Sequence, residues 1–529
     1  MRKKDLERFK SLNELIHGYA DEEGLKTKEI VWEFCNPGKM WEAASTGLPT
    51  NFSFWYHGRL FDEARMKHEQ GMGEIYEIVF NYENPYALLS RTNSLALNLL
   101  VAAHVRGHVD FNLRNVFIAR ARKRVDISHY AREAAERFDE YYRMYGTDAV
   151  EKVIEAGYAV RECMSPNPHH EFEEENIVRQ RLIEAERRKI AKIKEHLFIK
   201  RDQRRKQVEE VEERIKGLKK KTPPAPEYDV LGYLLRHSSR EHEPYVLDIL
   251  NVIYEEFHHL APISRCHILN EGWASYWHEI FMRRLFEEKH ITDEEFGDIT
   301  SKHAGVLTKI SGRMAGFNFN PYFLGRALWE DLRDRWDHGQ FGMDYLENRD
   351  PLKRTTWQKS GHSGEGKKKI FEVSELYDDR MAVSDPNIFS DEFIRHNELF
   401  VWGSVVDAQG DQIVTVLEDH PDVIRHILTL QRTNYGRPLI AVVDGNYKGR
   451  GELYLRHDFH GTELDPRHEI SVLEYLYFIY GNTVHLETAE IVERNVSGAP
   501  TKIKAILHTY NGNKHSFDEE KPQVFSSNG

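Results

Sequence analysis

Hydrophobic positions repeat at helical spacing through most of the first 375 residues, and strand-like runs replace them after residue 397. Apolar residues three to four positions apart indicate amphipathic helices, whereas alternating or β-branched runs indicate strands. The pattern therefore predicts an α+β protein. We expect a large, mainly α-helical N-terminal domain at 1–375, a smaller C-terminal α+β domain at 385–515 and a polar tail at 516–529.

One segment of the helical region has a different composition. Between residues 172 and 221, Glu, Lys and Arg alternate, with Leu, Ile and Val only at sparse intervals. This pattern is typical of a long exposed helix or a coiled-coil arm inserted in the domain. Interleaved acids such as Glu209 and Glu213 favour a solvated charged helix over a nucleic-acid-binding surface, so we expect no nucleic-acid partner.

A stripe of polar residues runs along the otherwise apolar segment 263–286. His267, Glu271, Ser275 and His278 lie at offsets of zero, four, eight and eleven, which places them on one face of a helix. A carboxylate among aromatic side chains loses hydration that a metal, a cation or several donors must replace. The stripe is therefore interpreted either as a satisfied core hydrogen-bond network or as a metal or catalytic site.

Two other segments add candidate ligands. His104 and His108 are one turn apart in the helical segment 92–115, the spacing used by zinc-binding helices. In the segment 245–260, Glu255 precedes His258 by three residues, as in di-iron carboxylate proteins. Such proteins need two Glu-x-x-His pairs and two further glutamates on four helices. The sequence offers one pair, so the di-iron interpretation is the weakest.

Composition limits the setting of the protein. A chain of 529 residues is too long for a single core, and its net charge of −13 gives no general attraction to nucleic acid or anionic membranes. The three cysteines have no CxxC spacing, which fits a reducing compartment. No apolar run reaches the roughly 18 residues of a membrane span. We therefore expect a cytoplasmic protein with no membrane span.

Five separated motifs resemble the SpoVR family, the stage V sporulation protein R group. The resemblance implies a cytoplasmic protein involved in sporulation, spore-cortex formation or starvation responses, working with a PrkA-type serine kinase and a YhbH-type partner. It implies no established reaction. The motifs are GLPTNFSFW at 47–55, EIYEIVFNYENP at 74–85, GHVDFNLRN at 107–115, NEGWASYWH at 270–278 and NPYFLG at 320–325.

A second, weaker resemblance is to gluzincin-type metallopeptidases. These enzymes pair two histidines one turn apart with a glutamate on a later helix, and some carry that glutamate in a Glu-Gly-Trp-Ala sequence. The resemblance implies that His104, His108 and Glu271 bind zinc or another divalent metal. The chain departs from the pattern at Val105, where the class has the glutamate that serves as general base.

The missing base leaves alternatives open. His278 and Glu255 are the candidates for the catalytic base. A metal set of His108, Glu271 and one further histidine, such as His267, His278 or His258, is a second arrangement. The first functional hypothesis is a metal-dependent hydrolase or amidase acting on a peptide-like substrate, such as a cell-wall precursor. The alternative is a non-enzymatic regulatory scaffold, in which the polar stripes form hydrogen bonds that stabilise the core and the arm binds partners.

Overall fold

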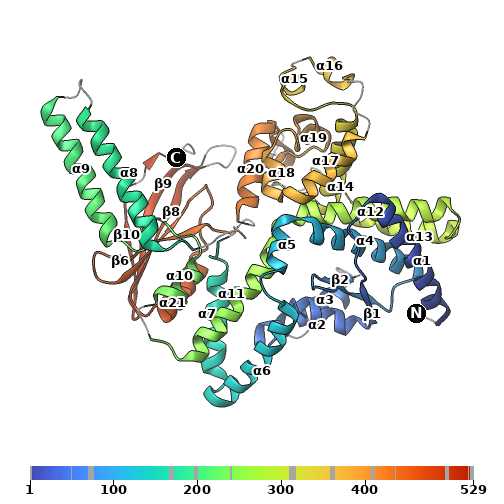
Figure 1. Cartoon of the computed structure of the whole chain (residues 1–529), viewed down its shortest axis with the longest axis horizontal. Helices are drawn as coiled ribbons and strands as arrows, with labels where there is room; N and C mark the ends of the chain where they lie inside the picture. The colour runs from blue at the N-terminus through green and yellow to red at the C-terminus, as the bar shows by residue number, and fades with distance from the viewer. Residues whose placement is uncertain are drawn as a thin grey trace. The chain divides into compact units, whose positions relative to one another are not determined.

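The computed structural model describes residues 3–524 with internal gaps, and the chain forms two compact units, each assembled from two segments (Figure 1). Unit 1 consists of residues 1–140 and 258–436, and unit 2 of residues 141–257 and 437–529. The boundaries expected near residues 375 and 385 stay a prediction. The gaps are residues 49–50, 70–76, 166–171, 196–199, 239–240, 309–316, 318, 349, 358–363, 407–411, 435–436, 495–499 and 522.

The predicted fold class is confirmed, because the described residues form a mainly helical α+β structure. The first half of the chain contains α1 (Lys3–Glu23), β1 (Val31–Cys35), α2 (Pro37–Thr46), α3 (Trp55–Glu69), β2 (Glu77–Phe80), β3 (Tyr86–Ser90), α4 (Leu95–Arg114), α5 (Val116–Arg122), α6 (Ile127–Tyr145), α7 (Thr147–Arg161), α8 (Glu175–Glu195), α9 (Arg201–Lys220), α10 (Val230–His237) and α11 (Pro244–Arg265).

The second half begins with helices and ends with most of the strands. It contains α12 (His267–Glu287), α13 (Asp293–Val306), α14 (Pro321–Asp337), α15 (Met343–Leu346), α16 (Pro351–Thr355), α17 (Glu365–Leu376), α18 (Asp379–Ser384), α19 (Asp391–His396), β4 (Val401–Val406), β5 (Gln412–Glu418), α20 (Pro421–Thr433), β6 (Ile440–Tyr447), β7 (Glu452–His457), α21 (Pro466–Tyr480), β8 (Val484–Arg494), β9 (Pro500–Tyr510), β10 (His515–Glu519) and β11 (Gln523–Val524).

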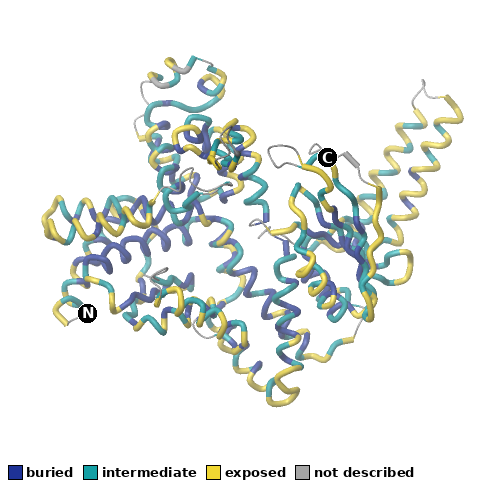
Figure 2. Tube along the Cα trace, turned by 180° about the vertical axis from the view of Figure 1, so that it is seen from behind, coloured by how far each residue is buried: buried dark blue, intermediate teal, exposed yellow. Residues whose placement is uncertain are grey.

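Helix α4 is the central helix of unit 1. It begins where the Ser94 side chain accepts a hydrogen bond from the backbone N–H of Leu97 (3.1 Å). Nearly all of its residues are buried, as expected for a helix that is apolar around its whole circumference. The burial colouring in Figure 2 marks the buried parts of unit 1, to which α4 contributes most of its length and α12 most of its residues from Ile268 to His278. Polar side chains on these parts of the two helices are therefore largely removed from water.

Helix α12 begins later than its sequence pattern predicts. The pattern places one helix over 263–286, but α11 continues through Pro262 to Arg265, and α12 starts at His267. The break follows from a buried carboxylate, because Asp379 accepts hydrogen bonds from the backbone N–H groups of Ile268 (2.8 Å) and Leu269 (3.0 Å). These groups have no partner within the helix, so Asp379 fixes the first turn of α12.

Glycine contacts bring the backbones of three helices of unit 1 unusually close. A Cβ placed on Gly107 of α4 would lie 2.5 Å from Cα of Ala274 on α12. A Cβ on Gly272 would lie 2.4 Å from Cα of Gly325 on α14. Trp273, between the two α12 contacts, donates a hydrogen bond from Nε1 to Asp110 Oδ2 of α4 (2.7 Å). Helices α4 and α12 therefore pack directly against each other.

A small sheet covers part of this helical core. Its strand order is β1-β3-β2, with β1 parallel and β2 antiparallel to β3. β2 is an edge strand that contacts α4, and Glu77 is its first residue. Residues 75 and 76, which precede Glu77 in the chain, lie outside the described residues. The edge position leaves one side of β2 without a strand partner in the described sheet.

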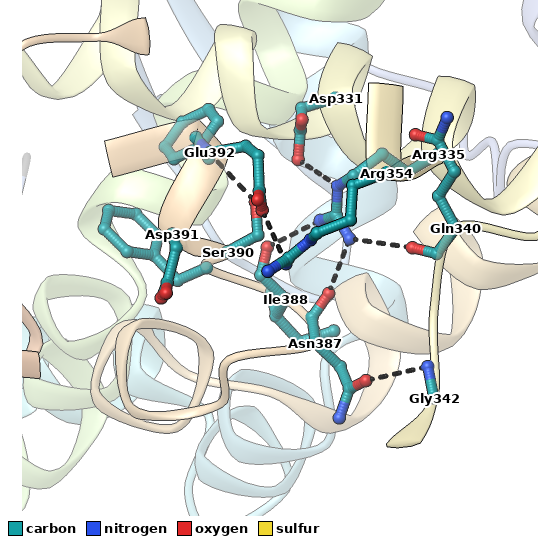
Figure 3. Close-up of polar contacts among 12 residues, drawn as sticks. Asp331, Arg335, Gln340, Gly342, Arg354, Asn387, Ile388, Ser390, Asp391 and Glu392 are labelled. Atoms are coloured by element: carbon teal, nitrogen blue, oxygen red, sulfur yellow. Dashed lines mark hydrogen bonds and ion pairs between the residues drawn. The ribbon is translucent and has the colours of Figure 1, made fainter. Parts of the chain in front are cut away.

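A buried arginine holds the segments that follow α14 (Figure 3). Arg335 donates hydrogen bonds to Asp331 Oδ2 (2.7 Å) and to the backbone carbonyls of Asn387 and Ile388 (3.0 Å each). Nearby, Arg354 pairs with Glu392 (2.9 Å). A planar guanidinium can satisfy several acceptors at once, which suits this junction between α14 and the turn before α19.

Unit 2 contains the larger sheet, ordered β10-β9-β8-β7-β6, with helix α21 packed against it. The sequence placed residues 516–529 in a polar tail, whereas β10 pairs antiparallel with β9. Asn511 explains the difference, because its Oδ1 accepts hydrogen bonds from the backbone N–H groups of Asn513 and Lys514 (3.1 Å each) and closes a tight turn. Residues 525–529 lie outside the described range.

The charged arm is a hairpin of two helices, α8 and α9, which run side by side (Figure 1). Arg179 of α8 donates to the carbonyl of Leu218 (3.1 Å), and Arg214 of α9 donates to Glu186 (3.1 Å). Within the described part of the arm helices, only Val211 and Ile215 are buried. Across all described helices, the combination of length and apolar character required for a membrane crossing does not occur.

Candidate metal centre

Two histidines of α4 and one glutamate of α12 converge on a single point in unit 1. His104 Nε2 lies 3.5 Å and His108 Nε2 lies 3.4 Å from Glu271 Oε2. The i, i+4 spacing aims both rings to one side of α4, and the Gly107–Ala274 contact allows α12 to approach that side. The structure therefore brings together the three residues that the gluzincin resemblance implies as metal ligands.

The spacing of these donor atoms fits a tetrahedral metal site. Bonds of about 2.0–2.1 Å to zinc place tetrahedral ligand atoms about 3.3–3.4 Å apart. Glu271 Oε2 is also buried and accepts no hydrogen bond of normal geometry within the described structure. A buried carboxylate oxygen in that state costs free energy unless a cation compensates it. Two imidazoles and one carboxylate are a set that binds zinc, so the residues present fit a divalent metal.

Glu77 supplies a second carboxylate from the edge strand β2. Its Oε1 lies 3.9 Å from His104 Nε2, and donor atoms of Glu77, His104 and His108 all lie within 4.8 Å of one another. Burial raises the pKa of Glu77 above its usual value, although the two histidines oppose this shift. Glu77 is therefore placed to bind a metal or to exchange a proton beside one.

Tyr322 adds a phenol to the site. It lies in the first turn of α14, where Asn320 Oδ1 accepts a hydrogen bond from its backbone N–H (3.0 Å). Its ring stacks near the His104 ring at a centroid distance of 6.3 Å. Burial, together with the charges of Glu271 and Glu77, raises the pKa of Tyr322. The hydroxyl therefore keeps its proton and can donate a hydrogen bond.

The metal-free site is an ion pair. Burial disfavours a charge on His108, but the Glu271 carboxylate and a hydrogen bond to Asn270 outweigh burial and raise the pKa of His108 to about 9. Burial would likewise raise the pKa of Glu271, but the charges of His108 and His104 lower it. In the absence of metal, a proton thus occupies the position that a divalent cation would take.

Both ligand histidines have a second partner on the ring nitrogen that faces away from Glu271. His108 Nδ1 lies 3.0 Å from Asn270 Oδ1, which as an acceptor fixes the proton on Nδ1 and leaves the Nε2 lone pair directed at the site. His104 Nδ1 lies 2.9 Å from His278 Nδ1. Such partners set the tautomer and orientation of a metal-binding imidazole.

His278 is engaged at both ring nitrogens. Besides its contact with His104, its Nε2 lies 2.6 Å from Nδ1 of His303 on α13. Burial, followed by the neighbouring His104 and His303, lowers the pKa of His278. His278 is therefore a neutral imidazole behind His104, in a position to orient that ligand.

The other residues proposed from the sequence lie farther from this cluster or in the other unit. His267 Nδ1 lies 3.9 Å from Glu271 Oε1, and its side chain is half exposed. Ser275 is fully buried. Glu255 lies on the part of α11 that belongs to unit 2, and His258 follows on the part that belongs to unit 1. The base role of Glu255 and the ligand role of His258 stay predictions.

Sequence reasoning missed Glu77 and Tyr322 as site residues. Both lie within motifs that carry the SpoVR resemblance, Glu77 in EIYEIVFNYENP and Tyr322 in NPYFLG. The structure forms strand β2 within the first motif and begins helix α14 within the second. The signal in the sequence that could have identified them is a polar residue inside an otherwise apolar segment.

Comparison with known proteins identifies the family. Residues 3–437 match the family model described as SpoVR like protein, a range that includes every residue of the cluster. The chain is also similar to "Uncharacterized protein YcgB" of Escherichia coli (strain K12), with 24% identity over 296 residues, 55% of this chain and 56% of that protein. The chain thus spans about half the length of this curated relative. No solved structure matches the chain significantly. Since the family model covers most of the sequence, the chain belongs to the SpoVR-like protein family.

Proposed function

We propose that the chain is a metal-dependent hydrolase or amidase that cleaves an amide bond of a peptide-like substrate. The observation that carries this proposal is the convergence of His104, His108 and Glu271, with Glu271 Oε2 buried 3.4–3.5 Å from both imidazole nitrogens. A cell-wall precursor is the substrate class that we propose.

The three convergent residues would hold the metal. A bound divalent ion supplies Lewis acidity, which polarises a carbonyl and lowers the pKa of water. Tyr322 supplies a neutral hydroxyl that can donate a hydrogen bond to the oxygen that becomes negative as the amide carbon turns tetrahedral. Burial of the cluster strengthens each of these electrostatic interactions.

In this proposal Glu77 is the general base, because Val105 occupies the position where gluzincins have the glutamate that serves as base. The Glu77 carboxylate accepts a proton from the attacking water and passes it to the leaving amine. Its position 3.9 Å from His104 Nε2 and its raised pKa suit a group that changes protonation state beside the ligands. His278 is less suited to that role because both of its ring nitrogens are engaged.

The proposed cellular setting follows from the family. We propose a cytoplasmic role in sporulation, spore-cortex formation or the starvation response, together with a PrkA-type serine kinase and a YhbH-type partner. A cell-wall-precursor substrate is consistent with spore-cortex formation.

A regulatory scaffold is the second candidate function. The observation that favours it is the arm formed by α8 and α9, whose described residues are almost entirely solvent-accessible. In that case the ion pair between His108 and Glu271 would only stabilise the fold, and a chelator would change neither the stability nor the function of the protein.

The test combines metal analysis with hydrolysis assays on full-length protein purified without a histidine tag. We expect one zinc or similar ion per chain and cleavage within a panel of short peptides that includes D-amino-acid peptides of the cell-wall-precursor type. Glu77→Gln should keep the metal and lose activity about 100-fold or more, within the range expected for a general base.

The matched control is Glu83→Gln, which removes the same charge from an exposed residue that pairs with Lys28. This variant should keep both metal and activity. Cleavage that is unaffected by Glu77→Gln contradicts the base assignment, and loss of metal in that variant makes Glu77 a ligand instead. A metal-free protein that is inactive on every substrate supports the scaffold.

A further inference from the structure

Strands β4 (Val401–Val406) and β5 (Gln412–Glu418) form a two-stranded antiparallel sheet in unit 1. Within the described part of the chain, each of these strands pairs along one edge only. A two-stranded sheet is marginally stable by itself, because its outer backbone N–H and C=O groups have no partner strand. The outer edge of β5 can therefore accept a further strand.

The side chains of β5 are unusually apolar for a strand in this position. Ile413, Val414 and Val416 are 44%, 41% and 37% exposed. Ile413 and Val414 are consecutive, so their side chains point to opposite faces of the sheet, and water reaches apolar side chains on both faces. In an antiparallel sheet that borders water, the exposed face is normally polar. The composition of β5 thus fits a strand inside a larger sheet better than an edge.

The edge of β5 lacks the usual protection against pairing with another chain. Lysine, proline and bulges commonly protect an exposed edge. The sequence of β5, QIVTVLE, contains no Lys, Arg, Pro or Gly, and its single charged residue, Glu418, is at its end. The register shift between β4 and β5 lies beyond Val416, so the pairing is regular from Gln412 to that residue. Nothing in the sequence of β5 therefore opposes the addition of a strand.

The strand is also complementary to itself in the antiparallel direction. Its central stretch, Ile413–Leu417, reads in either direction as two apolar residues, Thr415 and two apolar residues. If two copies pair about Thr415, each apolar side chain lies opposite an apolar side chain. Glu418 then lies opposite Gln412 of the second copy rather than opposite another acid. Apolar pairs and threonine pairs stabilise antiparallel sheets, so a second copy of the chain fits this edge.

We propose that β5 is a dimerisation edge, at which two copies of the chain pair antiparallel about Thr415 and join their hairpins into a four-stranded sheet. The two-fold axis through Thr415 makes the interface isologous, so assembly stops at the dimer. β5 has seven residues and a length of about 24 Å. A contact of this size belongs to the weak class below about 1,200 Å², so the dimer forms in a concentration-dependent way. The inference does not use the metal site and is independent of the proposed hydrolase activity.

Disulfide cross-linking of the full-length protein tests the register. Residues directly opposite each other in an antiparallel pair have Cα atoms about 4.5–5.5 Å apart, within the range that a disulfide spans. Thr415→Cys, a change of similar size, should therefore give a disulfide-linked dimer under mild oxidation. Val414→Cys is the matched control, because the two copies of residue 414 would be diagonal neighbours about 7–8 Å apart, too far for a disulfide. This variant and wild type should stay uncross-linked.

Sedimentation equilibrium with charged variants tests the interface without cross-linking. In the dimer, Thr415→Glu places two carboxylates opposite each other at the two-fold axis, which should raise the Kd of the dimer at least about 10-fold. Thr415→Lys should do the same, and an equimolar mixture of the two variants should dimerise again, which also shows that both are folded. Ser404→Glu, at an exposed position of β4, is the control and should stay within about threefold of wild type.

Three results overturn the inference. The first is a wild-type protein that stays monomeric up to its solubility limit. The second is a dimer whose Kd is unaffected by Thr415→Glu, because the two copies would then meet at another surface. The third is faster cross-linking of Val414→Cys than of Thr415→Cys, which contradicts pairing about Thr415.

Discussion

Replacing Gly107 by alanine tests whether close helix packing creates the site. The added Cβ would lie 2.5 Å from Cα of Ala274 and 3.2 Å from its Cβ. Ordinary carbon contacts lie at about 3.5–4.0 Å, so α4 and α12 must separate by about 1 Å. Overpacking against backbone costs about 3 kcal/mol, and the better helix propensity of alanine returns about 1 kcal/mol. We therefore expect the free energy of unfolding of unit 1 to fall by about 2 kcal/mol.

The same shift should weaken the metal site. If α12 moves by about 1 Å, the distances of 3.4–3.5 Å between Glu271 Oε2 and the two imidazole nitrogens approach about 4.5 Å, beyond the spacing that zinc requires. We expect zinc affinity to fall at least 10-fold. Gly58→Ala is the control, because nothing lies within 4 Å of its added Cβ. The free energy of unfolding of that variant should rise by up to about 1 kcal/mol, because alanine has the better helix propensity.

Urea unfolding followed by tryptophan fluorescence measures the effect directly. All nine tryptophans of the chain lie in unit 1, so the signal reports on that unit alone. Zinc affinity is measured on the same samples by chelator competition. A Gly107→Ala protein that is as stable as wild type and binds zinc equally well would refute the packing argument.

Three further predictions use the same assays. Burial raises the pKa of Asp379 to about 7, above about 3.9 in an unfolded chain, so the folded state holds the extra proton and stability falls as the pH rises between these values. From pH 5 to pH 7 wild type should lose about 2 kcal/mol more than Asp379→Asn, at about 1.4 kcal/mol per pKa unit; equal slopes would contradict this. Asn270→Ala removes the acceptor for His108 and should lower zinc affinity 10- to 100-fold, with unchanged affinity as the contrary result. Arg335→Met leaves the partly buried Asp331 carboxylate and two backbone carbonyls without their donor and should cost about 3 kcal/mol, whereas Arg59→Met, at an exposed pair, should cost under about 1 kcal/mol.

The sequence predicted the two helices of the site because their signals are local. Four-residue spacing puts His104 and His108 on one side of any helix, whatever surrounds it. The prediction that Glu271 lies opposite these histidines came from a resemblance, because residue spacing within one helix does not show which other helix packs against it. The contact between Gly107 and Ala274 that makes this placement work depends on two backbones meeting, which hydrophobic periodicity does not encode.

Glu77 and Tyr322 illustrate a different limit. Glu77 reaches the site because β2 is the edge strand of a three-stranded sheet, and a register shift of one residue would turn its side chain to the other face. Tyr322 reaches it because Gly325, one turn later, packs against Gly272. Both depend on tertiary contacts between segments far apart in the chain.

Element boundaries failed where one long-range contact overrides local preference. Pro262 is a usual helix breaker, but α11 continues through it and ends where Asp379, more than a hundred residues later, binds the first amides of α12. The interleaving of the two units is likewise invisible to composition, because the chain passes between them within α6 and α11, two ordinary amphipathic helices.

Metal binding by wild type and by Glu271→Gln tests the central claim most directly. Glutamine keeps the shape of the side chain and removes its charge, and Glu287→Gln, at an exposed position of the same helix, is the matched control. We expect wild type and the control to bind one zinc ion and to lose thermal stability when a chelator is added, since zinc at 100 times its dissociation constant contributes about 2.7 kcal/mol. Glu271→Gln should fold and bind zinc at least 100-fold more weakly. Its melting temperature should not change when the chelator is added. Identical melting of wild type and Glu271→Gln with and without chelator, with no zinc bound to either, would contradict the metal site.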